Sequence, residues 1–366
     1  MRVRPAAGTV QRKPHTNISI YSNRPAGKVG AVLDPRERTY RAIERRAPDR
    51  VPAFFSTLPG AQRDLGSALG CIWQEYPQDI KTFGYPSTEE FSGKAGVPAI
   101  DRWGAAWNSA SDDVKGQVVE HPLADWGNLS TFSWPEPLGW IEFESARSYL
   151  HSDRGQHYVL ADGDTLFQRM MYLRGIEALF VDLITGTDEV TELRDRIRDY
   201  MIARIRRWNG IGVDGIYFRD DWGSQESLLI NPKLWRGFFK PTYAELFAAV
   251  HAGDAHVFFH SDGMIAAIIP DLIEIGVDVI HPQMQVLGAG TLARQYGEQL
   301  SFMCDPDRQH ILPYGTPHDV EQHIHQTLAT LSHAQGGVIG WGEIGPDVPL
   351  ENTRAMVRAF AEWRYR

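Results

Sequence analysis

Short apolar runs alternate with amphipathic segments along the chain from about residue 155 onward. The runs predict strands, because each is brief, rich in β-branched or aromatic residues, and followed by polar residues. The predicted strands cover residues 157–160, 215–218, 256–259, 278–280, 300–303 and 337–340. The predicted helices cover residues 186–208, 232–251, 265–275, 317–333 and 350–364. Strands that alternate with helices are typical of a parallel sheet with helical crossovers.

The segment before this alternation is less regular. Asp34 is a plausible N-cap for a helix over residues 36–46, and Pro48 ends that helix. Residues 50–55 read as a strand. Residues 60–150 are rich in Trp, Gly and Pro, show no evident long helix, and predict loops, short strands and short helices over one end of the main body.

One more strand from the unclear region would bring the count to about eight, which fits a closed (β/α)8 barrel. We therefore predict an α/β protein with a distorted TIM barrel. An open doubly wound sheet is the alternative. Such a sheet usually has a glycine-rich phosphate turn near its start, and the sequence has no G-x-G-x-x-G or G-x-x-x-x-G-K-[ST].

The beginning of the chain has a different composition. Six basic residues precede the first acidic residue, Asp34, and no helical or strand period persists there. We predict an N-terminal extension over residues 1–35, which is flexible, drapes over the surface or embraces a partner subunit. The single barrel domain then covers residues 36–366.

Composition narrows the class of protein. Of the 366 residues, 43% are apolar and 23% charged, as in globular domains rather than disordered chains. No apolar run approaches the roughly 20 residues of a membrane-spanning helix, and a net charge of −9 argues against nucleic acid as a partner. Cys71 and Cys304 are too few for a disulfide framework, so a reducing cytoplasm is expected.

Candidate chemistry lies where the predicted strands end, since barrel active sites form at the carboxyl ends of the strands. His260-Ser261-Asp262 is the sharpest feature. In extended backbone, residues i and i+2 point the same way, so His260 and Asp262 would face one cavity. With Glu343 from the last strand they could bind a divalent metal through nitrogen and oxygen. In the alternative, Asp262 only hydrogen-bonds a turn and His260 a neighbouring carbonyl.

Asp220 and Asp221 follow the strand at 215–218. Adjacent residues of an extended segment face opposite sides, so only one would enter the site, as acid, base or ligand. The alternative is a turn-forming pair. We take Asp220, Asp221 and His260 as candidate catalytic residues.

Aromatic and amide side chains in the same loops are candidates for substrate contacts. Tryptophans could wall the pocket, amides could position substrate, and a histidine could hold an anionic group. The candidate substrate-binding residues are Trp103, Trp107, Trp222, Gln225, Gln283 and His310.

Several short motifs, taken together and in order, resemble the uroporphyrinogen decarboxylase superfamily, whose members are distorted (β/α)8 barrels. The motifs are Arg36-Glu37-Arg38, Asp49-Arg50-Val51-Pro52, Asp220-Asp221-Trp222-Gly223-Ser224-Gln225, Phe239-Lys240-Pro241, His260-Ser261-Asp262-Gly263, Ile269-Pro270-Asp271-Leu272-Ile273, Pro313-Tyr314-Gly315-Thr316-Pro317 and Pro349-Leu350-Glu351-Asn352. They span nearly the whole chain after residue 35.

The resemblance implies one of two chemistries. Porphyrin decarboxylases of the superfamily grip substrate carboxylates with an arginine-rich segment after the first strand, but residues 54–60 here contain no arginine. The other branch contains zinc-dependent methyltransferases that work with corrinoid proteins and carry His-x-Cys plus a later Cys. Here His260 matches the histidine, Asp262 replaces the first cysteine, and Gly342 or Glu343 stands at the later position.

We therefore expect metal-assisted transfer of a methyl or other one-carbon group on a small organic substrate, with a corrinoid protein as possible partner. A carboxylate-rich site is harder than a thiolate site, so the acceptor need not be a thiol. The alternatives are a cofactor-free decarboxylase of a porphyrinogen-like or smaller aromatic acid, and a barrel that only binds a ligand. The resemblance also implies a homodimer.

Overall fold

The computed structural model describes residues 32–84, 95–112, 116–137, 141–153 and 156–365. The chain divides into two compact units, Met1–Leu33 and Asp34–Arg366, and the second contains the helices and strands of the described residues. Nearly all of the predicted extension over residues 1–35 lies outside the described residues. In the described ranges, no helix has both the length and the apolar content needed to cross a bilayer.

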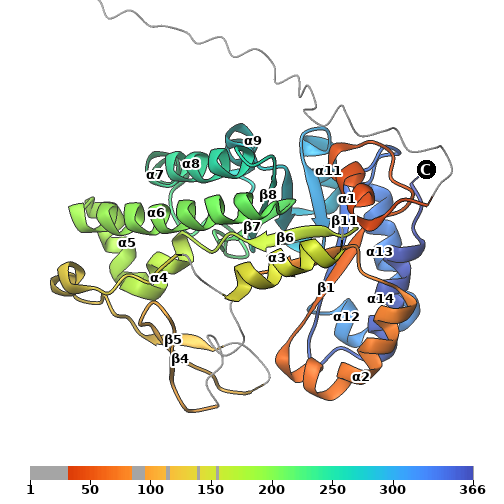
Figure 1. The fold of residues 1–366 in the computed structure, drawn as a ribbon, viewed down its shortest axis with the longest axis horizontal. Coiled ribbons are helices and arrows are strands. Elements are labelled where there is room, and N and C mark those ends of the chain that lie inside the picture. The colour runs from red at the N-terminus through yellow and green to blue at the C-terminus, as the bar shows by residue number, and fades with distance from the viewer. Residues whose placement is uncertain (1–31, 85–94, 113–115, 138–140, 154–155, 366) are drawn as a thin grey trace, which may run out of the picture. The chain divides into compact units, whose positions relative to one another are not determined.

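A sheet of eight parallel strands forms the centre of the described chain (Figure 1). Its order is β1-β11-β10-β9-β8-β7-β6-β2. The two outer strands of this order approach each other, and the amide of Asp79 donates to the carbonyl of Ala53 at 2.9 Å. The sheet is thus a nearly closed barrel, which confirms the predicted TIM barrel. The strands are β1 (Ala53–Thr57), β2 (Ile80–Phe83), β6 (Tyr158–Asp162), β7 (Gly215–Arg219), β8 (His256–Ser261), β9 (Val279–Pro282), β10 (Ser301–Cys304) and β11 (Val338–Ile344).

Helices connect the strands, and α6 and α8 run side by side outside β7 and β8 (Figure 1). The predicted helix over residues 232–251 is two helices, which meet at Phe239 just before Pro241. The helices are α1 (Pro35–Glu44), α2 (Pro59–Glu75), α3 (Ile141–Asp153), α4 (Phe167–Arg174), α5 (Ile176–Thr185), α6 (Asp188–Ile211), α7 (Pro232–Phe238), α8 (Lys240–His251), α9 (Ile269–Ile275), α10 (Met284–Leu287), α11 (Ala289–Tyr296), α12 (Ile311–Tyr314), α13 (Pro317–Leu331) and α14 (Leu350–Glu362).

The expectation that residues 60–150 hold no long helix is wrong at its start. Helix α2 runs for 17 residues. Its N-cap, Leu58, makes no side-chain capping bond, and Gly66 and Gly70 weaken the helical signal inside it. After α2 the region contains β2 and, as predicted, further short elements, namely β3 (Ala99–Ile100), β4 (Ala106–Asn108), β5 (Gln117–Glu120) and the 3-10 helix η2 (Trp126–Thr131). It ends within α3, a helix of 13 residues.

Alternation along the strands separates two apolar layers. Val257 and Phe259 of β8 belong to the large core between the strands and the helices. Phe258, between them, lies 6.0 Å from Tyr158 and 6.3 Å from Tyr217 by ring centroids, inside the barrel. The residue two further along the interior side of β8 is His260, so the same period carries the interior face from aromatic filling to polar chemistry at the carboxyl end.

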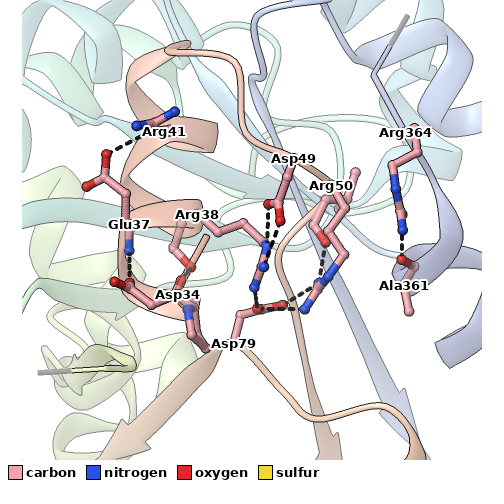
Figure 2. Close-up of polar contacts among 12 residues, drawn as sticks. Asp34, Glu37, Arg38, Arg41, Asp49, Arg50, Asp79, Ala361 and Arg364 are labelled. Atoms are coloured by element: carbon pink, nitrogen blue, oxygen red, sulfur yellow. Dashed lines mark hydrogen bonds and ion pairs between the residues drawn. The ribbon is translucent and has the colours of Figure 1, made fainter. Parts of the chain in front are cut away.

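The amino end of the barrel is closed by a buried ion network. Figure 2 shows Arg38 and Arg50 converging on Asp79, with contacts of 2.7 Å each. Arg38 also binds Asp49 at 2.6 Å. Asp79, 1% exposed, accepts the amide of Ala53 as well. The charged residues of the first two motifs, Arg38, Asp49 and Arg50, therefore join α1 to the gap between β1 and β2. This gap lies away from the carboxyl end, where barrel chemistry occurs.

Candidate active site

Polar side chains that follow strands β6 to β11 form a series of contacts around the carboxyl end of the barrel, which we call the mouth. Parallel register brings neighbours together, since Arg219 pairs with His260 and His260 with His281. The linking contacts are an ion pair of Arg219 with Asp162, a ring contact of His260 with His281 at 4.5 Å, a distance of 3.8 Å between His281 Nε2 and Asp305 Oδ2, and an Arg308 side chain that touches both Asp305 and Glu343.

Three of the predicted catalytic and metal-binding residues form a cluster in this ring. Asp221, His260 and Asp262 each offer one ligand atom, and these atoms lie within 4.8 Å of one another. His260 Nε2 is 3.5 Å from Asp221 Oδ1 and 3.8 Å from Asp262 Oδ1. Asp262 Oδ1 is buried and has no hydrogen-bond partner among the described residues. We refer to these three residues as the DHD cluster.

Hydrogen bonds orient the His260 and Asp221 side chains of the DHD cluster. His260 Nδ1 donates to the carbonyl of His281 at 2.9 Å, since a carbonyl oxygen can only accept, and this leaves Nε2 facing the two carboxylates. Asp221 accepts from Gln168 Nε2 at 2.7 Å and from the amide of Asp262 at 3.0 Å. Two of the three ligand side chains, those of His260 and Asp221, are therefore held by a second group, as is usual around metal ligands.

The loops that carry the cluster touch through their backbones. Gly223 donates its amide to the carbonyl of Asp262 at 3.2 Å, and Met264 donates to Ser224 at 2.7 Å. Gly263 has φ +80°, and a Cβ there would lie 2.2 Å from backbone atoms of Gly223. Glycine at both positions allows this approach, which fixes the distance between Asp221 and Asp262.

Arg308 stands between Asp262 and Glu343. Its Nε is 2.9 Å from Asp305, while its Nη1 is 3.4 Å from Glu343 and its Nη2 is 3.5 Å from Asp262. Glu343 is thus a partner of a guanidinium and is not part of the DHD cluster. The predicted metal set of His260, Asp262 and Glu343 is brought together only for its first two members.

Two buried titratable groups, Asp305 and His281, lie behind the side chains of the barrel mouth. Burial raises the pKa of Asp305 to about 8, against the opposing effect of Arg308. Burial also lowers the pKa of His281 well below its usual value, and the charges of His260 and Arg308 act in the same direction. His281 Nδ1 lies 2.6 Å from the hydroxyl of Tyr217. His281 is therefore a neutral imidazole at neutral pH.

The chemistry of the DHD cluster suits a divalent cation. One imidazole nitrogen and two carboxylate oxygens are donors that zinc and other first-row metals accept, and three protein ligands leave a position for substrate. Asp262 Oδ1 accepts no hydrogen bond among the described residues and has only long ion-pair contacts with His260 and Arg308, so a cation would satisfy it. The residues present therefore fit a bound metal.

A family model described as uroporphyrinogen decarboxylase (URO-D) matches residues 165–363, more than half of the chain. The chain belongs to the URO-D family. Among curated proteins, the methylcobamide:CoM methyltransferase MtbA of Methanosarcina mazei is 23% identical over 349 residues, covering 90% of this chain and 98% of that protein. The MtbA of Methanosarcina acetivorans is 21% identical, with the same coverage.

Among solved structures, a methyltransferase from Methanosarcina mazei superposes with a TM-score of 0.68 at 16% identity, covering 90% of this chain and 99% of that chain. This likeness establishes the fold. It agrees with the URO-D family match and with the barrel predicted from the strand pattern.

Within this URO-D barrel, the two adjacent aspartates face opposite sides, as predicted. Asp220 is fully buried and accepts hydrogen bonds from the amides of Leu166 and Gln168 and from the hydroxyl of Tyr243. Burial raises its pKa to about 7. Asp220 therefore anchors the start of α4 and does not reach the mouth, whereas Asp221 does.

The three tryptophans expected to wall the pocket lie in the core. Trp222 is 0% exposed and stacks on Phe167 at 4.0 Å. Trp103 and Trp107 are also buried, and Trp107 packs edge-on against Tyr172. Each indole is therefore packed by protein and has almost no surface left for a ligand.

The remaining substrate-binding candidates differ in position. Gln283 Oε1 accepts the amide of Gly263 at 3.0 Å, which places it beside the DHD cluster, and Gln225 lies 3.4 Å from Gln283. His310 has a side chain that is 75% exposed and lies 3.3 Å from Asp307, so it faces solvent. Among the residues to which the sequence assigned no role, Arg219 and Arg308 line the mouth, and His281 and Asp305 are buried behind it. Each follows a predicted strand, and that position was the available signal.

Proposed function

We propose that this protein is a metal-dependent methyltransferase, which exchanges a methyl group between a corrinoid-carrying partner and a small organic substrate. Three observations support this: membership of the URO-D family, relatives named as methylcobamide:CoM methyltransferases that cover 90% of the chain, and the DHD cluster at the barrel mouth. The DHD cluster is the observation that carries the proposal, because the family match and the named relatives are similarities to other proteins.

The residues of the DHD cluster would hold the cation through His260 Nε2 and one oxygen each of Asp221 and Asp262. A divalent cation bound there would supply Lewis acidity at its open position. The chain's own contribution is orientation. The carbonyl of His281 keeps the proton of His260 on Nδ1, and Gln168 holds the second oxygen of Asp221.

The donor set also bears on the substrate. Carboxylate and imidazole ligands favour harder metals and harder substrate atoms than a thiolate-rich site does. We therefore propose that the substrate atom next to the DHD cluster is an oxygen or nitrogen rather than a thiol sulfur. We also propose that the metal is zinc, that the protein forms a homodimer and that its partner is a corrinoid protein.

The test measures methyl transfer with the full-length chain. The protein is loaded with Zn²⁺ and mixed with methylcobalamin and a panel of small thiols, alcohols and amines, and loss of the cobalt–carbon bond is followed by visible absorbance. We expect transfer that needs the metal and that falls more than about 100-fold in His260→Ala, beyond the loss typical of residues that only orient a metal ligand.

His318→Ala is the matched control, since this histidine is exposed on α13 and lies outside the mouth network. It should retain full activity. Carbon dioxide release from an aromatic acid without metal would instead support the cofactor-free decarboxylase and contradict the methyltransferase.

A further inference from the structure

Arg308 faces three carboxylates at the barrel mouth, and its two terminal nitrogens lie farther from their partners than its Nε does. A guanidinium offers five N–H donors in a planar fork. Nε is bound at full strength, 2.9 Å from Asp305, but the two terminal nitrogens lie 3.4 and 3.5 Å from Glu343 and Asp262. The side chain is 29% exposed. The terminal nitrogens are thus held only at long distance, and an exchange of one carboxylate partner would let the guanidinium bind another planar anion.

Buried polar atoms beneath Arg308 also lack partners. His281 Nε2 and Asp305 Oδ1 have no hydrogen bond among the described residues, although both side chains are at most 3% exposed. Unsatisfied buried atoms of this kind indicate a place for a polar ligand or ordered water. The side of the mouth around Arg308 is thus built to receive polar groups.

One oxygen connects Arg308 to the DHD cluster. Asp262 Oδ1 lies 3.5 Å from Arg308 Nη2 and 3.8 Å from His260 Nε2. A divalent cation on the DHD cluster would compete with the guanidinium for this oxygen, and the two positive charges would repel each other at short range. Binding of the metal would therefore release Nη2 from its carboxylate.

We propose that Arg308 binds an anionic group of the substrate after a divalent cation has taken Asp262 from it. The substrate would then carry a carboxylate, sulfonate or phosphonate close to its reacting atom. This inference rests on the proposed function, because it needs the DHD cluster to hold a metal.

Such an arrangement makes the two ligands interdependent. Without metal, the carboxylates of Asp221, Asp262 and Glu343 repel an incoming anion, and Asp262 faces Arg308. With a metal bound, its positive charge offsets the carboxylates, and the guanidinium of Arg308 can bind the anion. By linkage, an anion that binds better to the metal-loaded protein must also raise the affinity for the metal.

The experiment measures zinc affinity of the full-length protein by competition with a chromogenic chelator, with and without methanesulfonate, an anion that coordinates metals poorly. For the wild-type chain we expect methanesulfonate to tighten zinc binding about 5-fold or more, the lower end of typical coupling between sites. In Arg308→Gln, zinc should bind more tightly than in wild type without the anion, and methanesulfonate should have no effect.

Two further variants serve as controls. Arg219→Gln removes an arginine of similar exposure, 23% against 29%, that pairs with Asp162 on the opposite side of the DHD cluster, and it should retain the methanesulfonate effect. Arg308→Lys keeps the charge without the fork, and it should keep the weaker zinc affinity while losing most of the methanesulfonate effect.

Unchanged zinc affinity in Arg308→Gln, or an equal methanesulfonate effect in that variant and wild type, would overturn the inference and leave the proposed function standing. Failure of the wild-type chain to bind zinc through His260 would remove the proposed function itself. The two failures are therefore distinguishable in one titration series.

Discussion

His260 illustrates how a single residue acquires a chemical role from its neighbours. The sequence places it at the end of a strand, but its useful nitrogen is selected by the carbonyl of His281, 2.9 Å from Nδ1. The neighbouring aspartate is oriented in the same way, by Gln168. Ligand atoms that are held before a cation arrives lose less conformational freedom on binding, so the orienting residues should affect affinity without touching the metal.

Gln168→Ala tests this orienting role. The variant removes the 2.7 Å hydrogen bond to Asp221 Oδ2 and leaves all three ligand atoms in place. We expect zinc affinity to fall about 10-fold to 100-fold, the range for residues that orient ligands. Competition with a chelator measures it. Gln225→Ala, an exposed glutamine outside the DHD cluster, should change the affinity little, and equal losses in both variants would argue against a specific role of Gln168.

Asp305 gives the molecule a pH-dependent stability. Its pKa is raised by burial to about 8 from an ordinary value of 3.8, so the folded state keeps a proton that the unfolded chain loses. Stability should therefore fall as pH rises from about 4 to about 8. Urea unfolding across this range should show a smaller fall, by roughly 1–3 kcal/mol, in Asp305→Asn than in wild type. Parallel curves for the two proteins would contradict the assignment.

The limits of sequence reasoning are visible at individual residues. The period of two along a strand correctly placed His260 and Asp262 on one side and separated Asp220 from Asp221. It could not show which aspartate enters the mouth, because that depends on α4 beginning where Asp220 can accept its amides. It also could not show that Arg308, from the loop after β10, lies between Asp262 and Glu343.

At the scale of elements, the loops after β7 and β8 act as one unit. Their backbones approach at Gly223 and Gly263 so closely that no side chain fits between them. The distance between Asp221 and Asp262 is therefore set by backbone contact rather than by side-chain packing. The close approach of the two loop backbones thus determines the geometry of the DHD cluster.

Gly263→Ala should disrupt this unit. The substitution combines a positive φ, which costs an L-residue about 1–2 kcal/mol, with overpacking against Gly223, which typically costs a further 1–3 kcal/mol. We expect lower stability in urea unfolding and weaker zinc binding. Gly186→Ala is the matched control, because it also has a positive φ but nothing lies within 4 Å of its added Cβ. It should lose stability only, and equal zinc affinities in both variants would contradict the role of the loop contact.

Regular elements were predictable where capping and period agree. Helix α1 begins after its N-cap Asp34, whose carboxylate accepts the amide of Glu37, and α13 begins with a capping box at Thr316. Helix α2 was missed because its capping position holds Leu58, which has no oxygen to offer. The tryptophans in residues 60–150 signalled a pocket wall, but large aromatics signal burial equally well, and here they are buried.

The whole barrel depends on closure between β1 and β2 at its amino end. Asp79 supports this closure by binding Arg38, Arg50 and the amide of Ala53 while itself 1% exposed. Removal of one member of a buried ion network leaves the others unpaired. The Asp79 network therefore stabilises the frame that positions the mouth at the opposite end.

Asp79→Asn should destabilise the protein by about 3 kcal/mol, as for other broken buried ion pairs. Asp49→Asn, which removes an aspartate that is 29% exposed from the same Arg38, should cost about 1 kcal/mol or less. Urea unfolding of both variants measures the difference. Equal effects of the two substitutions would show that closure does not depend on the buried carboxylate.

Zinc titration of four single variants tests the central claim most directly, namely that Asp221, His260 and Asp262 form a metal site. The wild-type chain should bind about one Zn²⁺. Asp221→Asn, His260→Ala and Asp262→Asn should each lose more than about 100-fold in affinity, beyond the effect of residues that only orient ligands. Glu343→Gln should retain the site. Retained binding in Asp221→Asn together with lost binding in Glu343→Gln would contradict the account.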